Sequence, residues 1–165
     1  MGFAIRVATS TATTTATTAA APNPSRSAVP TASPKADRNS GSIIPASLQD
    51  TPMDFESFRK AGVSLGSGAL LIADQNTCIV DLAKVLLQFF RFESCGKCTP
   101  CRIGTQRLYE AVERITQGQG KLEELDKLLD IGKEMERASN CGLGQTASVP
   151  VRDMLKHFRT EVEAH

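Results

Sequence analysis

The residues with the most specific chemistry in this sequence are three cysteines at three-residue spacing, Cys95, Cys98 and Cys101. A fourth cysteine, Cys141, follows after 39 intervening residues. Three thiolates on one tight loop and one from a distant segment suit a cubane iron–sulfur cluster, because the loop can bind three irons while the remote cysteine binds the fourth. The spacing therefore favours a [4Fe-4S] cluster held by these four cysteines.

The residues around the three close cysteines are consistent with such a loop. Gly96 allows a tight turn and a close approach of backbone N–H groups to cluster sulfurs. Thr99 and Pro100 predict a helix N-cap followed by the first helical residue, so the positive end of a helix dipole would lie beside an anionic cluster. We expect the positive charges of Lys97 and Arg102 to raise the reduction potential of the cluster.

A structural zinc site with four cysteine ligands is the main alternative. Zinc sites usually pair two separated Cys-x2-Cys knuckles, which three evenly spaced cysteines and one remote partner match poorly. Disulfides are less favoured, because the chain is not a small cysteine-rich domain of the secreted kind. Four cysteines in a metal-ligand pattern indicate a reducing compartment, and the fifth, Cys78, is interpreted as a small buried hydrophobic residue.

Helical periodicity predicts the elements that position these cysteines. Apolar residues recur at three- and four-residue steps in four segments, which we expect to be helices over residues 77–92, 100–117, 121–139 and 149–163. Short connections favour antiparallel neighbours, hence a four-helix bundle. In an up-down bundle the first and third connections share one end, so Cys141 would lie beside the other three cysteines.

The first of these helices should be the most buried, because its apolar face is the widest. Its core candidates are Ile79, Val80, Leu82, Ala83, Val85, Leu86, Leu87, Phe89 and Phe90. The whole chain is therefore predicted to be mainly α.

The chain divides into three parts by composition. Residues 1–40 are a low-complexity stretch rich in Thr, Ala, Pro and Ser, which we expect to be a disordered tail. Residues 41–75 contain a short extended segment at Ser42–Pro45, a helix that starts at Thr51, and a buried strand at Gly68–Asp74. Residues 76–165 hold the bundle and the cysteines.

Composition excludes some classes of function and leaves the origin of the tail open. A net charge of +1 gives no signature of nucleic-acid binding, and no run of 18 apolar residues predicts a membrane span. The tail is compatible with an organelle transit peptide, although it lacks an amphipathic arginine stripe. We favour a linker or a rearranged gene start over an import signal as the origin of the tail. The expected location of the protein is the cytoplasm, and a position at the periphery of a membrane complex is an alternative within it.

The cysteine motif also resembles a known family. The run Ser94–Arg102, followed by Cys141-Gly142-Leu143-Gly144, is similar to the C-terminal iron–sulfur region of the NADH-binding flavoprotein subunits of complex I. Relatives of these subunits occur in NAD-linked hydrogenases and formate dehydrogenases, and the run Cys141–Thr146 looks more like that branch. The resemblance covers residues 41–165, in which Ile44–Phe55 and Gly66–Ala69 look like parts of a small β-grasp domain.

The resemblance implies a [4Fe-4S] cluster that takes electrons from a flavin and passes them to another cluster. It also implies partners in a multi-subunit oxidoreductase. Members of the family carry a domain for FMN and NAD(H), but residues 1–40 contain nothing that could supply it. FMN and NAD(H) binding are therefore expected only in an absent domain or a partner, and the chain is interpreted as a truncated member with half of its β-grasp domain.

Three hypotheses for function follow. The first is an electron-transfer module with one [4Fe-4S] cluster bound by the four cysteines and no catalytic residue of its own. The second is a structural or regulatory helical module that binds zinc. The third is a non-functional gene fragment, suggested by the incomplete β-grasp domain and the unusual tail.

Overall fold

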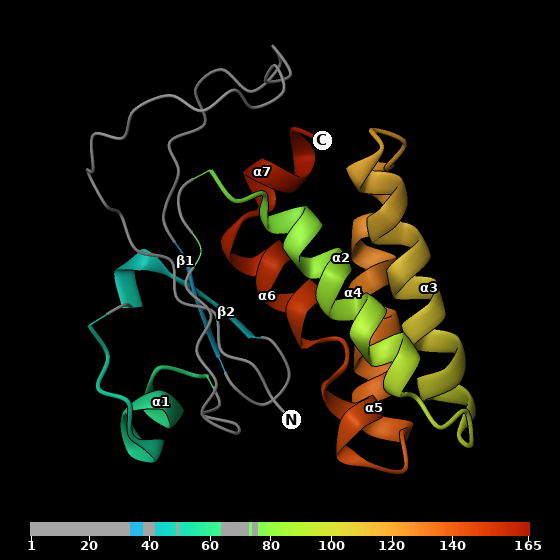
Figure 1. Ribbon diagram of the computed structural model, residues 1–165, viewed down its shortest axis with the longest axis horizontal. Coiled ribbons are helices and arrows are strands. Elements are labelled where there is room, and N and C mark those ends of the chain that lie inside the picture. Colours follow the sequence, from blue (N-terminus) through green and yellow to red (C-terminus); the bar gives the residue numbers. More distant parts are fainter. Residues whose placement is uncertain (1–33, 38–41, 49, 64–72, 74–75) are drawn as a thin grey trace, which may run out of the picture.

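The computed structural model shows a mainly α protein and describes residues 34–37, 42–48, 50–63, 73 and 76–165 (Figure 1). Seven α-helices, one 3-10 helix and two strands lie in these ranges. In chain order they are β1 (Pro34–Asp37), β2 (Ser42–Pro45), η2 (Ala46–Leu48), α1 (Phe55–Lys60), α2 (Ile79–Glu93), α3 (Thr99–Thr116), α4 (Leu122–Ala138), α5 (Gly142–Thr146), α6 (Val149–His157) and α7 (Arg159–Glu163).

The predicted four-helix bundle is confirmed and consists of α2, α3, α4 and α6. Each of these helices packs against two others, in the cyclic order α2, α3, α4, α6. The connection between α4 and α6 contains the short helix α5, which contacts α2, α3 and α4. Figure 1 shows α5 and the connection between α2 and α3 at the same end of the bundle, as the up-down arrangement requires.

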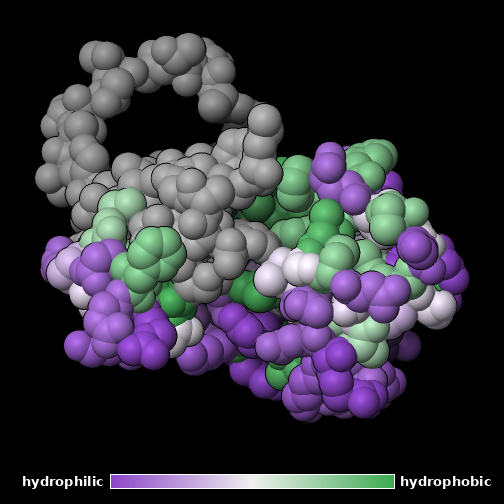
Figure 2. Space-filling model, turned by 90° about the horizontal axis from the view of Figure 1, so that it is seen from below, coloured by the Kyte–Doolittle hydropathy of each residue, from purple (hydrophilic) through white to green (hydrophobic). Residues whose placement is uncertain are grey.

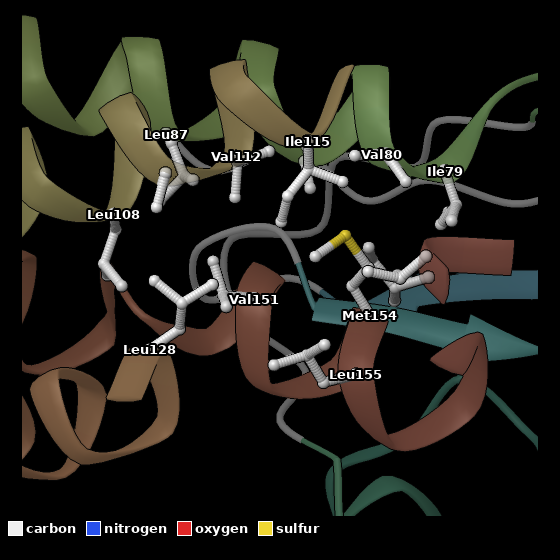
Figure 3. Packing of buried hydrophobic residues seen from close by; sticks show 14 of the residues in the cluster. Ile79, Val80, Leu87, Leu108, Val112, Ile115, Leu128, Val151, Met154 and Leu155 are labelled. Carbon is white, nitrogen blue, oxygen red and sulfur yellow. The ribbon is translucent and has the colours of Figure 1, made fainter. Parts of the chain in front are cut away.

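Apolar side chains from all four helices meet in one core (Figure 3). Leu87 of α2, Leu108 of α3 and Val151 of α6 are almost completely buried there, and Leu128 of α4 closes the space between them. Each fully buried side chain of this size stabilises the fold by about 1.5–3 kcal/mol relative to leaving it in water. The bundle therefore provides a packed support for the loops at its end.

The prediction for α2 was right about the helix and wrong about part of its face. Ile79, Val80, Ala83, Leu87 and Phe90 are buried, as expected. Two further core candidates of this helix, at positions 85 and 89, are exposed, because the side chains of a helix that packs on one side cannot all point inward.

The last predicted helix is broken in two. Its residues 149–163 form α6 and α7, which are separated at Phe158, where φ is −132° and ψ is 27°. No Pro or Gly marks this position, so the break has no signal in the sequence. Phe158 and Val162 are both buried in the bundle core, which holds the two helices on the same hydrophobic surface.

The first part of the described chain packs against α6 through β2. The strands β1 and β2 pair in antiparallel fashion, with Pro34 opposite Pro45 and Asp37 opposite Ser42. The backbone N–H of Ile43 donates to the buried carboxylate of Asp153 at 3.2 Å, and Ile43 itself belongs to the bundle core. Residues 43 and 153 therefore join β2 to the bundle.

Two details of the predicted N-terminal elements differ from the structure. The strand β1 lies inside the predicted tail of residues 1–40, whose other residues are outside the described ranges. Helix α1 starts after Asp54 and not after Thr51, because the Asp54 carboxylate accepts the N–H of Ser57 at 2.8 Å while the Thr51 hydroxyl donates to Leu48. Helix α1 ends at Lys60, and Gly62 follows it with a positive φ of 72°.

The predicted strand at 68–74 lies outside the described residues except for Ala73, which is buried. No helix in the part of the chain that the structure describes has both the length and the hydropathy needed to cross a membrane. The division at residues 40 and 75 stays a prediction.

Candidate metal centre

The loop between α2 and α3 positions three of the four cysteines. Helix α2 ends at Glu93 with Ser94 as its C-cap, and Gly96 then adopts a φ of 72°, a left-handed conformation that glycine accepts without steric cost. Cys98 is the N-cap of α3, so this helix begins one residue earlier than predicted, with Thr99 as its first residue. Cys95 is exposed, Cys98 is half-buried and Cys101 is buried in the first turn of α3. The exposure of the three thiols thus decreases along the loop, from Cys95 at the surface to Cys101 in the interior.

Arg102 holds this loop in its turned conformation. Its Nη1 donates to the carbonyl oxygen of Gly96 at 2.6 Å, and its Nη2 lies 3.5 Å from Oγ1 of Thr99. Lys97 is exposed, and no hydrogen bond or ion pair is described for its side chain. The structure thus gives Arg102 a contact with the backbone of the loop, a role that the prediction of a purely electrostatic effect did not include.

The turn between α4 and α5 brings the fourth cysteine to this loop. Cys141 is exposed and precedes α5 with an extended backbone, and the side-chain amide of Gln145 holds the turn by donating to the carbonyl of Ser139 at 3.0 Å. The backbone N–H groups of Asn140 and then of Cys101 lower the pKa of the Cys98 thiol by stabilising its thiolate. Helix α5, which follows Cys141, contacts α3, whose first turn contains Cys101.

The surroundings of Cys101 shift the pKa of its thiol. Burial raises the pKa of the Cys101 thiol, and a hydrogen bond with Ser94 acts in the opposite direction. The charges of the other three predicted ligands add to the rise, because a nearby negative thiolate disfavours a second one. A bound cation or iron–sulfur core would offset this repulsion and stabilise the thiolate form of Cys101.

Gly144 allows the turn to approach Cys101. A Cβ added at this residue would lie 2.9 Å from the Cβ of Cys101 and 2.6 Å from Oγ of Ser139. Gly142, in the same short helix, would meet nothing within 4 Å. The absence of a side chain at Gly144 therefore lets α5 lie directly against the first turn of α3.

Figure 2 looks onto the molecule from below, and the face that it shows mixes hydrophilic and hydrophobic side chains.

The donor set and its surroundings fit an iron–sulfur cluster. Four cysteines supply thiolates, two of them at the surface and one in the core, and the hydroxyl of Ser139 is a buried polar group without a protein hydrogen-bond partner in the described part of the chain. Among the described residues, no three Cys, His, Asp or Glu side chains form a group that could hold a single metal ion. The assignment of the four cysteines as ligands thus stays a prediction.

Two hydroxyl groups at this site were not predicted from the sequence. Ser94 Oγ lies 3.3 Å from Sγ of Cys101, and Ser139 and Cys101 both lie close to Gly144. Ser94 had a signal, since it directly precedes the first cysteine of the loop. Ser139 had none, because its position follows from the packing of α5 against α3.

The remaining cysteine and the two histidines lie elsewhere. Cys78 is the N-cap of α2, at the helix end opposite the cysteine loop, and it is buried, as predicted. Its Sγ lies 3.1 Å from Nε2 of His165. His157 is half-buried and packs edge-on against Phe158. These residues are thus separate from the four cysteines.

Comparison with known proteins identifies the helical part of the chain. Residues 81–165 match the family described as the iron–sulfur binding region of NADH-ubiquinone oxidoreductase F. The chain is 42% identical over 122 residues to the F subunit of the NADH-quinone oxidoreductase of Rickettsia conorii, a match that covers 74% of this chain and 29% of the relative. It is 40% identical over 126 residues to the HndC subunit of the NADP-reducing hydrogenase of Solidesulfovibrio fructosivorans, a match that covers 76% and 26%.

A solved structure shows the same fold. The structure of an NAD+-reducing [NiFe]-hydrogenase in its H2-reduced state matches 79% of this chain and 22% of its own chain, with a TM-score of 0.70 and 34% identity. The chain spans less than a third of the length of the curated relatives named above.

Proposed function

Because the chain belongs to the iron–sulfur binding region family of NADH-ubiquinone oxidoreductase F, we propose that it binds one [4Fe-4S] cluster through Cys95, Cys98, Cys101 and Cys141. The observation that carries the proposal is the close approach of two segments: a Cβ at Gly144 of α5 would lie 2.9 Å from the Cβ of Cys101 in the first turn of α3. Three ligands would come from one loop and the fourth from the turn before α5. When bound, a cluster of this kind supplies reversible one-electron storage.

The residues of this chain bind and orient the cluster and move no proton. Cys101 in the first turn of α3 supplies the innermost thiolate, and Arg102 keeps the loop turned through its bond to Gly96. Cys95 and Cys141 are exposed, so the site lies at the surface, where an electron donor or acceptor can approach. Electron transfer needs only this proximity, hence no acid–base residue is required.

The proposed donor is a reduced flavin, and the proposed acceptor is another iron–sulfur cluster. Relatives are named as subunits of NADH-quinone oxidoreductase and of hydrogenase, which supports partners in a multi-subunit oxidoreductase. The flavin and NAD(H) sites would belong to a further domain or to a partner protein. This chain would then be one step of an electron pathway and not the site of NADH oxidation.

Anaerobic mixing with an excess of reduced flavin mononucleotide tests the proposal. The protein is first reconstituted with iron and sulfide, and its EPR spectrum is recorded after mixing and freezing. We expect a signal from a reduced cluster in the wild-type protein and none in Cys141→Ser. A reconstituted protein that dithionite reduces but reduced flavin does not would contradict the assigned donor, and a protein with one tightly bound zinc and no iron would support a structural site.

A further inference from the structure

The hydroxyl of Ser94 is placed to donate a hydrogen bond to a cluster ligand. Its Oγ lies 3.3 Å from Sγ of Cys101 and accepts the backbone N–H of Gly96, also at 3.3 Å. A thiolate that binds iron carries no proton, so in the loaded protein the hydroxyl must be the donor of this pair. The N–H of Gly96 polarises the hydroxyl and strengthens its bond to the sulfur.

The hydroxyl of Ser139 lies near the same cysteine. A Cβ added at Gly144 would lie 2.6 Å from Oγ of Ser139 and 2.9 Å from the Cβ of Cys101. Both atoms are therefore close to the same point. Ser139 is 5% exposed, and its hydroxyl has no hydrogen-bond partner among the described residues. Buried hydroxyls in proteins are nearly always hydrogen-bonded, so this one points to an acceptor that the protein itself does not supply.

Two other polar side chains of the site already have protein partners. Arg102 bonds to Gly96 and Thr99, and Gln145 bonds to the carbonyl of Ser139. The backbone N–H groups that reach a sulfur act on Cys98, which is a different ligand. Among the described side chains, the two serine hydroxyls are thus the groups that geometry places beside Cys101 with a proton to donate.

We propose that Ser94 and Ser139 are positioning residues that donate hydrogen bonds to the sulfur side of the cluster at Cys101 and raise its reduction potential. The inference rests on the proposed function, since it requires a cluster at the four cysteines. Reduction adds one electron and no proton, so the reduced cluster is more negative and gains more from a hydrogen-bond donor than the oxidised cluster does. Loss of either donor therefore lowers the potential.

A redox titration monitored by EPR on the reconstituted full chain tests this inference. The variants are Ser94→Ala and Ser139→Ala, each of which removes one hydroxyl, and Ser94→Thr, which keeps the hydroxyl. Ser148→Ala is the matched control, because Ser148 is also buried but its hydroxyl donates to the carbonyl of Gly132 at 3.4 Å. Iron and sulfide content is measured for each protein before titration.

The expected result is a lower midpoint potential for each Ala variant. We expect a roughly tenfold change in the reduction equilibrium, about 59 mV for a one-electron couple. Ser94→Thr and Ser148→Ala should keep the wild-type potential. A purely structural role of Ser94 would not predict a potential that falls in Ser94→Ala and is kept in Ser94→Thr. Unchanged potentials in both Ala variants at full iron content would overturn the inference.

The outcomes separate this inference from the proposed function. A wild-type protein without a [4Fe-4S] signal refutes the proposed function and the inference together. A normal wild-type signal with unshifted Ala variants refutes the inference alone. Should Ser94→Ala hold no cluster, Ser139→Ala decides: a lowered potential supports the inference, and a wild-type potential overturns it.

Discussion

Gly144 is the residue whose side chain, or lack of one, most directly controls the site. A Cβ at this position would press on Cys101 and Ser139, since it would lie closer to both than side-chain carbons approach in real structures. Overpacking of this kind costs about 1–3 kcal/mol. The position of Cys101 therefore depends on a glycine in another helix.

Gly144→Ala is accordingly expected to lower both the melting temperature and the iron content after reconstitution. Gly142→Ala is the matched control, because it adds the same methyl group to the same helix with nothing within 4 Å. Its expected effect is neutral to slightly stabilising, as for Gly-to-Ala changes in helices. Differential scanning calorimetry and iron analysis of the two variants check this pair, and equal iron contents would contradict the close approach at Gly144.

Arg102 and Lys97 carry the same charge but differ in their contacts. Arg102→Gln removes the bond to the carbonyl of Gly96, whose net contribution is about 1 kcal/mol. We expect about fivefold faster loss of iron to a chelator, because the loop opens more often. Lys97→Gln removes an exposed charge without such a bond and should lose iron at nearly the wild-type rate. Equal rates of iron loss in the two variants would show that the positive charge, and not the contact of Arg102 with the loop, controls iron retention.

At the scale of elements, β2 and α6 are joined by one buried carboxylate. Asp153 is 5% exposed, accepts the N–H of Ile43 at 3.2 Å and pairs with Arg152 Nε at 3.1 Å. Asp153→Ala leaves the N–H of Ile43 buried without a partner, which costs about 1–3 kcal/mol. Urea unfolding should show this loss as a lower midpoint.

Asp130→Ala provides the comparison for that experiment. Asp130 pairs with Lys133 at 2.9 Å on the exposed face of α4, and exposed pairs contribute about 0–1 kcal/mol. A midpoint for Asp153→Ala as high as that for Asp130→Ala would show that the carboxylate does not hold the strand.

The helices were largely predictable because their apolar periodicity reflects the packing that forms them. The starts and ends of α2, α3 and α4 lie within two residues of the prediction. Helix α5 was missed, because five residues with two glycines carry no periodicity. The break at Phe158 and the exposure of Val85 and Phe89 depend on which neighbours each helix meets, which periodicity alone does not specify.

The candidate site was predictable to a similar degree. The cysteine spacing and the bundle topology together indicated that Cys141 lies beside the loop, and the structure packs α5, which follows Cys141, against α3, while the ligand assignment stays a prediction. The roles of Ser94 and Ser139 could not be predicted, because they follow from how α5 lies against α3 and how the loop turns. Residues that bind a cofactor have a sequence signature, whereas residues that support them are identified by geometry.

At the scale of the whole molecule, the site lies at one end of a bundle and two of its four thiols are exposed. The chain matches less than a third of the length of its relatives, and the proposed electron donor and acceptor would belong to other parts of an oxidoreductase. A site at the surface is consistent with such an exchange between separate domains or subunits. The bundle supports the ligands, and the proposed partners would supply the flavin and the next cluster.

The most direct test of the central claim is iron and sulfide analysis with low-temperature EPR on the anaerobically reconstituted protein. We predict about four irons and four sulfides per chain and an S = 1/2 signal after reduction with dithionite. We also predict loss of that signal in Cys141→Ser and its retention in Cys78→Ser, since Cys78 lies at the other end of α2. An unchanged cluster in Cys141→Ser, or a colourless protein with one zinc, would contradict the four-cysteine [4Fe-4S] site.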